Sequence, residues 1–240
     1  MLKSVLIVLL IFSVLFCILY FNRRYGKFNE IERFKVMNGV IDAPYIYYSH
    51  HKRVFSLLKQ FDTYCRENNI FYFLMGGALI GLERHNSSFI PWDDDIDICI
   101  LDTDEHFFQD YDRKMFIQVD EDIVEPPGYI IKYTENKKYK SDNEPFLDLF
   151  ILDSNTFEYK DELPKKAWPN EKYHDIISPL HEREFILYNK QGQIEDKIFI
   201  KVPNDIPKYL KRSYGNDFMT SFSYNKPHCN NCYTILTNII

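Results

Sequence analysis

The stretch Ile90-Pro91-Trp92-Asp93-Asp94-Asp95-Ile96-Asp97-Ile98-Cys99-Ile100 decides what this chain can fold into and what it can bind. From Asp95 onward the residues alternate, which predicts a β-strand with Asp95 and Asp97 on one face and three isoleucines on the other. Same-face neighbours in a strand lie about 7 Å apart, so two carboxylates can share a divalent cation or hold two. Because buried like charges cost stability, a bound cation is the natural reason for the pair.

A third acid, Asp148, lies in the apolar segment 145–152, which predicts another strand. A single acid among large apolar side chains is rarely buried unless it is paired or bound to a metal. If the two strands are neighbours, Asp148 joins Asp95 and Asp97 as a third ligand. An all-oxygen ligand set favours Mg²⁺ or Mn²⁺, ions that suit phosphate chemistry.

Two glycines, Gly76 and Gly77, stand between the apolar, aromatic run 70–75 and the segment 78–84. This order predicts a buried strand, a tight turn and a helix. Glycines at such a turn let backbone N–H groups and the helix N-terminus approach a phosphate closely. We therefore expect a phosphate-binding turn shortly before the acidic strand.

The rest of the chain predicts a mixture of helices and strands, and thus an α+β domain. The further expected elements are an amphipathic helix around 54–65 that ends at Asn68-Asn69, a capped helix at 103–115, a strand at 129–134, and a helix capped by Asp205 that ends at Gly215.

The N-terminal segment 4–21 contains eighteen uncharged residues, enough for a transmembrane helix. A cleaved signal peptide is the alternative, but the run is long and lacks a small-x-small cleavage site. We expect residues 1–24 to be an uncleaved anchor, residues 25–50 a stem and residues 51–240 one catalytic domain. The chain would then be a single-pass membrane protein, with a lumenal domain in the Golgi or endoplasmic reticulum of a eukaryote. Basic residues on both sides of the span leave its orientation open.

Composition excludes some classes of protein. Of the 240 residues, 45% are hydrophobic, which indicates an ordered globular domain. A net charge of −6 and the lack of a basic run argue against a nucleic-acid partner. The pair Cys229 and Cys232 is compatible with a local disulfide, with half a zinc site completed by His228, or with two free thiols.

Each acidic feature has a simpler interpretation. Asp93, Asp95 and Asp97 match the first ligands of a calcium loop, but Ile98 stands where that loop needs glycine. The acids could also form a solvated turn, although the isoleucine alternation argues for a buried strand. Asp148 could be a satisfied core acid.

The same motifs resemble those of the LicD-type phosphotransferases, which include bacterial phosphocholine transferases and the animal proteins fukutin and fukutin-related protein. Residues 73–85 are similar to the strand, glycine turn and helix of that family, and residues 89–97 to its specific "IPWDDDxD" signature. Residues 145–150 and 209–215 are similar to two later motifs. The resemblance covers roughly residues 54–218, while the tail after Gly215 matches no motif of the family.

The resemblance implies a nucleotidyltransferase-like mixed β-sheet flanked by helices. It implies catalytic and metal-binding roles for Asp95, Asp97 and Asp148, with Asp93 as an additional metal ligand or as a residue that supports the ligands. It implies donor-binding roles for five further residues: Gly76, Gly77, Arg84, His85 and Trp92. For Arg84 and His85 the simpler interpretation is a salt-bridged helix end and a surface histidine. The implied reaction moves a phospho-alcohol group from a CDP-activated donor, such as CDP-choline or CDP-ribitol, to a hydroxyl of a glycan and releases CMP.

Two other functions remain compatible with the sequence. A membrane-anchored glycosyltransferase also uses an Asp-x-Asp motif, in that case to hold a UDP-sugar. A catalytically inactive homologue could bind a glycan or a membrane partner. In the preferred mechanism an acceptor hydroxyl attacks the donor phosphate in line, and Asp148 or a neighbouring acid assists its deprotonation.

Overall fold

The structure is a computed structural model that describes residues 44–111, 117–119, 122–124, 130–141, 143–220, 228–229 and 231–235. The predicted anchor, residues 1–24, lies outside this part of the chain, as does most of the predicted stem, residues 25–50. Among the described residues no helix is both long and apolar enough to cross a membrane. The anchor therefore stays a prediction.

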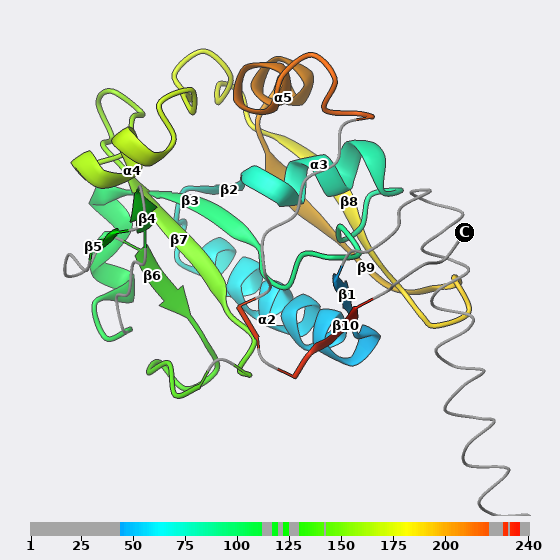
Figure 1. Ribbon diagram of the computed structural model, residues 1–240. Coiled ribbons are helices and arrows are strands. Elements are labelled where there is room, and N and C mark those ends of the chain that lie inside the picture. Colours follow the sequence, from blue (N-terminus) through cyan, green and yellow to red (C-terminus); the bar gives the residue numbers. More distant parts are fainter. Residues whose placement is uncertain are drawn as a thin grey trace, which may run out of the picture.

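A four-stranded mixed sheet in the order β2-β3-β7-β6 forms the centre of the fold (Figure 1). Strand β3 (Asp97–Leu101) pairs in parallel with β7 (Leu147–Leu152) and antiparallel with β2 (Tyr72–Leu74), while β6 (Ile130–Tyr133) is antiparallel to β7. Every residue of β2, β6 and β7 is buried. Strands covered on both faces read as apolar runs, which is why the sequence indicated them.

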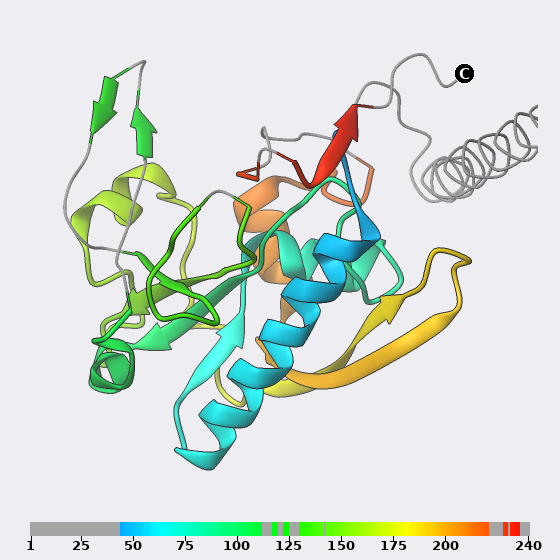
Figure 2. The same ribbon diagram turned by 90° about the horizontal axis from the view of Figure 1, so that it is seen from below.

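Helices cover both faces of this sheet (Figures 1 and 2). The long helix α2 (Tyr48–Glu67) lies on one face, and α3 (Gly76–Arg84) and α5 (Ile206–Tyr214) lie on the other. The mixture of sheet and helices confirms the predicted α+β class.

Aromatic rings join each helical layer to the sheet. On the α2 side, Phe61 packs edge-on against Tyr72 of β2, with ring centroids 5.3 Å apart. The next residue, Phe73, points to the opposite face because side chains alternate along a strand. There it contacts Tyr173, which stacks on Tyr209 of α5 at 5.7 Å.

The predicted elements are confirmed in most places. Helix α2 contains the segment 54–65 and ends at Glu67, just before Asn68-Asn69. Helix α5 is capped by Asp205, whose carboxylate accepts the Lys208 N–H at 3.0 Å, and it ends before Gly215. Asp stabilises this position by satisfying an N–H that has no partner inside the helix.

Two sequence expectations are wrong in detail. Strand β3 begins at Asp97, so Asp95 lies in the loop before the strand rather than on its face. The chain turns between Ile90 and Asp93, where the Ile90 carbonyl accepts the Asp93 N–H. Pairing with the neighbouring strands therefore starts only at Asp97. Within 103–115, the described residues form a 3₁₀ helix at Asp102–Phe108, the usual form of a short connector.

A long hairpin, β8 (His181–Tyr188) and β9 (Ile194–Val202), was not expected from the sequence. Its turn is closed by Asn189, whose side chain accepts the N–H groups of Gln191 and Gln193. The remaining elements are the short helix α4 (Glu162–Ala167) and the strand pair β4 (Ile117–Val119) and β5 (Asp122–Val124).

Two strands far apart in the sequence meet beside the loop before β3 that carries Asp93, Asp94 and Asp95, which we call the acidic loop. Strand β1 (Pro44–Ile46) pairs antiparallel with β10 (Tyr233–Ile235). The Ile46 N–H donates to the carbonyl of Pro91 at 2.8 Å, and the Tyr47 N–H donates to the carbonyl of Cys232 at 2.6 Å. The last residues of the predicted stem thus form β1 and the start of α2.

Candidate active site

Three acids converge where β3 and β7 begin. Asp97 and Asp148 are direct register partners in this parallel pair, and Asp95 lies two residues before the start of β3. One carboxylate oxygen from each lies within 4.8 Å of the others, so the group could hold a metal ion. The sequence thus identified the three acids that meet, although Asp95 reaches the group from a loop.

The electrostatics of this group favour a cation. Burial, reinforced by neighbouring acids that include Asp148, raises the pKa of Asp95 to about 7, although His228 opposes the rise. Burial and then the charges of Asp95 and Asp148 raise the pKa of Asp97 well above its ordinary value. Like charges in a low-dielectric site take up protons unless a positive charge replaces them. The all-carboxylate donor set fits a hard divalent cation.

The glycine turn lies directly against these acids. Gly76 has φ +57°, a conformation that suits glycine, and a Cβ there would lie 2.5 Å from Oδ2 of Asp97. A Cβ on Gly77 would collide with Oδ2 of Asp93. Both positions therefore need glycine for the acids to approach the start of α3.

The N–H of Gly76 is already used inside the protein, because it donates to the hydroxyl of Tyr209 at 3.1 Å. The Tyr209 hydroxyl in turn donates to Glu171 at 2.8 Å, and Glu171 also accepts from Tyr159 and Tyr173. This network fixes the turn from the α5 side. The sequence reading did not include Glu171, since nothing in its local pattern connects it to the acids.

Asp93 lies beside the group without joining the three acids whose oxygens could share an ion. Burial, then the charges of Asp95 and Asp94, raise the pKa of Asp93 well above its ordinary value. Its predicted role as an additional metal ligand stays a prediction, and its observed contact is with the Gly77 turn.

The three other predicted donor-binding residues contact one another. Arg84 Nε donates to Nε2 of His85 at 3.0 Å, and the guanidinium lies 5.8 Å from the centre of the Trp92 ring. Arg84 also donates to the carbonyl of Phe218 at 2.8 Å. His85 is fully buried, and burial lowers its pKa to about 3, so the ring is neutral. The structure joins these residues at the end of α3, and their role with the donor stays a prediction.

A buried lysine, which the sequence reading missed, belongs to the acid group. Lys132 on β6 donates to both carboxylate oxygens of Asp148, at 2.8 and 3.2 Å, and its ammonium lies 3.6 Å from the centre of the Phe146 ring. Only 7% of Lys132 is exposed. Lys132 could have been found in the same way as Asp148, because each is a single charged residue within an apolar strand.

His228 reaches the acidic loop from the C-terminal segment. Its Nδ1 lies 3.3 Å from Oδ1 of Asp94 and 3.3 Å from Oδ2 of Asp95. The hydrogen bond with Asp94 raises the pKa of His228 to about 9, although burial opposes it. Burial alone would raise the pKa of Asp94, but the bonds from His228 and from the Cys229 N–H outweigh it and lower that pKa. Asp94 is therefore ionised and paired with His228, whereas the pKa of Asp95 stays raised although it faces the same imidazole.

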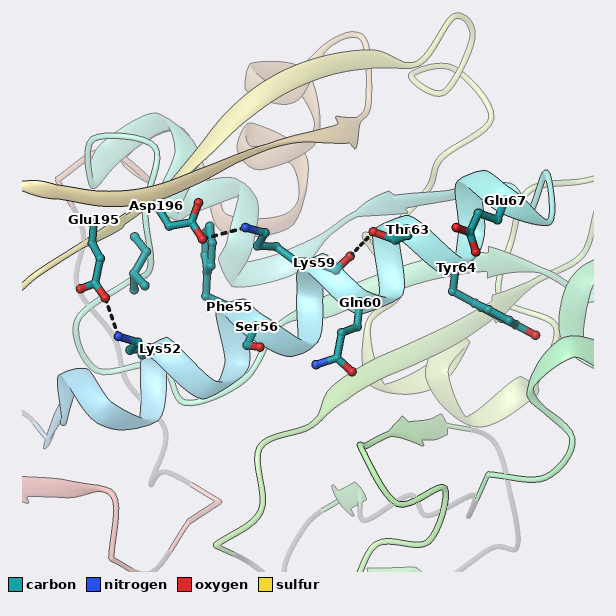
Figure 3. Close-up of a pocket in the computed structure, with 11 residues that line it drawn as sticks. Lys52, Phe55, Ser56, Lys59, Gln60, Thr63, Tyr64, Glu67, Glu195 and Asp196 are labelled. Carbon is teal, nitrogen blue, oxygen red and sulfur yellow. Dashed lines mark hydrogen bonds and ion pairs between the residues drawn. The ribbon is translucent and has the colours of Figure 1, made fainter.

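A groove of about 700 Å³ lies elsewhere, along the side of α2 that faces the β8–β9 hairpin (Figure 3). Ion pairs join its walls, Lys52 to Glu195 at 2.6 Å and Lys59 to Asp196 at 2.7 Å. None of the predicted site residues lines it. The groove is thus separate from the three converging acids.

Comparison with known proteins places these features in context. The sequence model described as "LicD/FKTN/FKRP, nucleotidyltransferase domain" matches residues 69–190, a range that contains the glycine turn and all three converging acids. An uncharacterized protein of Rickettsia prowazekii is 29% identical over 163 residues, which are 67% of this chain and 53% of that protein. The lipopolysaccharide cholinephosphotransferase LicD of Haemophilus influenzae is 34% identical over 134 residues, which are 51% of this chain and 48% of that protein. The chain thus spans about half the length of these two relatives.

Proposed function

Because this chain belongs to the LicD/FKTN/FKRP family of nucleotidyltransferase domains, we propose that it is a metal-dependent phosphotransferase. In this proposal it moves a phospho-alcohol group, of the phosphocholine or phospho-alditol type, from a CDP-activated donor to a hydroxyl of a glycan and releases CMP. The observation that carries the proposal is the convergence of Asp95, Asp97 and Asp148 against the Gly76 turn. The cholinephosphotransferase activity in the name of the Haemophilus relative supports it.

Mg²⁺ or Mn²⁺ is the proposed cofactor, held by Asp95, Asp97 and Asp148. When bound, such an ion neutralises charge on phosphate oxygens, including charge that develops in the transition state. One carboxylate oxygen from each acid lies within 4.8 Å of the others, and the pKa values of Asp95 and Asp97 are raised, so a positive charge between the acids is favourable.

The chain's own residues supply positioning and proton transfer. Lys132 holds Asp148 through both carboxylate oxygens, which orients that side chain. The first turn of α3 presents backbone N–H groups beside the acids, an arrangement that favours a donor phosphate. Asp148 or a neighbouring acid accepts the proton of the acceptor hydroxyl.

The proposed location follows from the sequence. Residues 1–24 would anchor the enzyme to a membrane, and the glycan acceptor would be reached from that surface. If the source is eukaryotic, the catalytic domain would lie in the lumen of the Golgi or endoplasmic reticulum.

The experiment is a panel of CDP-alcohols offered to the full-length protein with Mg²⁺ or Mn²⁺, with CMP release followed by mass spectrometry. We expect release from at least one CDP-alcohol and its loss in Asp97→Asn. The matched control is Asp110→Asn, which changes an exposed acid whose ion pair with Lys137 is 3.4 Å long. UDP-sugars in the same panel test the glycosyltransferase alternative. Release of UDP alone would replace the proposal, and equal CMP release by Asp97→Asn would refute it.

A further inference from the structure

A second group of metal-binding side chains lies behind the acidic loop. It consists of His50 at the start of α2, Asp94, Cys229 and Cys232, and one ligand atom from each lies within 4.8 Å of the others. All four are buried, with exposed fractions of 4%, 3%, 1% and 7%. Three segments that are distant in the sequence therefore bring two sulfurs, one imidazole and one carboxylate to a single enclosed point.

The donor types at this point differ from those of the three converging acids. Thiolates and imidazole select zinc over magnesium or calcium, which prefer oxygen ligands only. Four ligands that are closed off from solvent are the arrangement of a structural zinc site, whereas a catalytic site keeps one position open. One ring nitrogen of His50, Nε2, lies 2.8 Å from the carbonyl oxygen of Asp94. Zinc-binding histidines commonly hold such a bond through the nitrogen that does not bind the ion.

The apolar packing around this group is small. Strands β1 and β10 are three residues long, and the apolar cluster beneath them consists of Ile46, Cys229 and Cys232, with Tyr233 packed against it. So small a cluster is one that a disulfide or a metal ion reinforces. The Cys229 N–H donates to Oδ2 of Asp94 at 2.8 Å, so the unit is joined directly to the acidic loop.

In the structure Cys229 and Cys232 are joined as a disulfide. We propose that the same two sulfurs, once reduced, bind one Zn²⁺ together with His50 and Asp94. A dithiol reductant donates two electrons and two protons to the disulfide and becomes a disulfide itself. The two thiols then lose their protons as they bind the ion. The C-terminal segment is thus closed by a disulfide under oxidising conditions, whereas under reducing conditions zinc joins it, through Asp94, to the loop that carries Asp95.

The experiment measures zinc in the full-length protein after purification with a dithiol reductant and exposure to zinc alone, followed by removal of loosely bound metal. We expect about one zinc per chain, and less than a tenth of that in protein kept oxidised or in Cys232→Ser. Cys65→Ser is the matched control, because Cys65 is a buried free thiol in α2 outside this group, and it should keep its zinc. Asp97→Asn should also keep it, which separates this ion from one at the three acids.

A second measurement needs no variant. Cobalt added to the reduced wild-type protein should give the strong thiolate-to-cobalt absorption of a site with sulfur ligands, and zinc should abolish it. Reduced protein that holds no zinc and shows no such absorption would refute the site. Equal zinc in Cys232→Ser and wild type would refute the assignment of its ligands.

Discussion

Asp97 and Asp148 are direct partners across the parallel strands β3 and β7, and a cation between them is the proposed link. Their surroundings differ, since Lys132 pairs with Asp148, while Asp97 has mainly other acids near it. We therefore expect Asp97→Asn to raise the midpoint of thermal unfolding of the metal-free protein, and Asp148→Asn to lower it. Both should remove the rise in midpoint that Mn²⁺ gives the wild type, and each should reduce turnover at least about 100-fold. A full Mn²⁺ shift in either variant would contradict the shared site.

Asp95 makes one contribution to the pH dependence of stability that can be isolated. Its pKa is about 7 in the folded chain and near 4 when unfolded, so between these values the folded state binds the extra proton. The contribution of Asp95 to the free energy of unfolding of the metal-free protein therefore falls as pH rises from about 4 to about 7. Buried His85, whose pKa is lowered to about 3, contributes the opposite slope over much of this range, so the Asp95 contribution must be measured against a variant. Mn²⁺ should stabilise more at the higher pH.

Asp95→Asn is the variant that tests this origin, because it removes the titrating group. Without metal, the midpoint of the wild type minus that of Asp95→Asn should fall as pH rises from about 5 to about 7. A difference that stays constant or grows through this window would show that Asp95 does not carry the raised pKa.

Lys132 is expected to be a main stabilising residue of the acid group. Lys132→Met leaves Asp148 buried without its partner, which should cost about 3–5 kcal/mol in the free energy of unfolding. Lys137→Met is the control, because its ion pair with Asp110 is exposed, and it should change stability by less than about 0.5 kcal/mol. Urea unfolding measures both.

The double variant Lys132→Met, Asp148→Asn separates pairing from packing. If the loss comes from an unpaired buried charge, the double variant should be more stable than Lys132→Met alone. A double variant that is less stable than either single variant would show that Lys132 acts through its contact with Phe146 instead.

The glycine turn offers a matched pair of substitutions. Gly76 and Gly192 both have positive φ, +57° and +78°, so alanine at either should cost about 1 kcal/mol in backbone strain. Only at Gly76 does the new Cβ meet another group, Oδ2 of Asp97 at 2.5 Å, while Gly192 has nothing within 4 Å. Gly76→Ala should therefore destabilise the protein clearly more than Gly192→Ala and weaken Mn²⁺ binding. If Gly76→Ala and Gly192→Ala changed the affinity for Mn²⁺ equally, the glycine turn would not be part of the metal site.

Two of the three converging acids could be predicted from sequence because each stands between apolar residues of a strand, and Asp95 was found through its alternation with Asp97. Asp97 and Asp148 were identified as charges in buried strands, and the needed assumption, that these strands are neighbours, is what the parallel pairing confirms. Lys132 carried the same signal. His228 carried none, since it lies 134 residues from Asp94 and has no apolar pattern around it that places it.

The hairpin β8–β9 escaped prediction for a related reason. The first half of β8 is exposed and reads His181-Glu182-Arg183-Glu184, so no alternation of apolar and polar residues marks a strand there. Pairing with β9 supplies the stability that its sequence pattern does not show. The position of Asp95 just outside β3 is similar, because alternation in sequence does not reveal where pairing starts.

The contacts of the acidic loop reach beyond the segment that defines the family. Residues 69–190 contain the glycine turn and the three acids, yet Ile46, His50, His228 and Cys229, which hold the loop in place, all lie outside that range. A chimera in which only residues 69–190 replace the same segment of a distant relative would contain the three acids but not the flanking residues that contact the acidic loop. We expect such a chimera to keep its turnover only when the segments before and after residues 69–190 are exchanged as well.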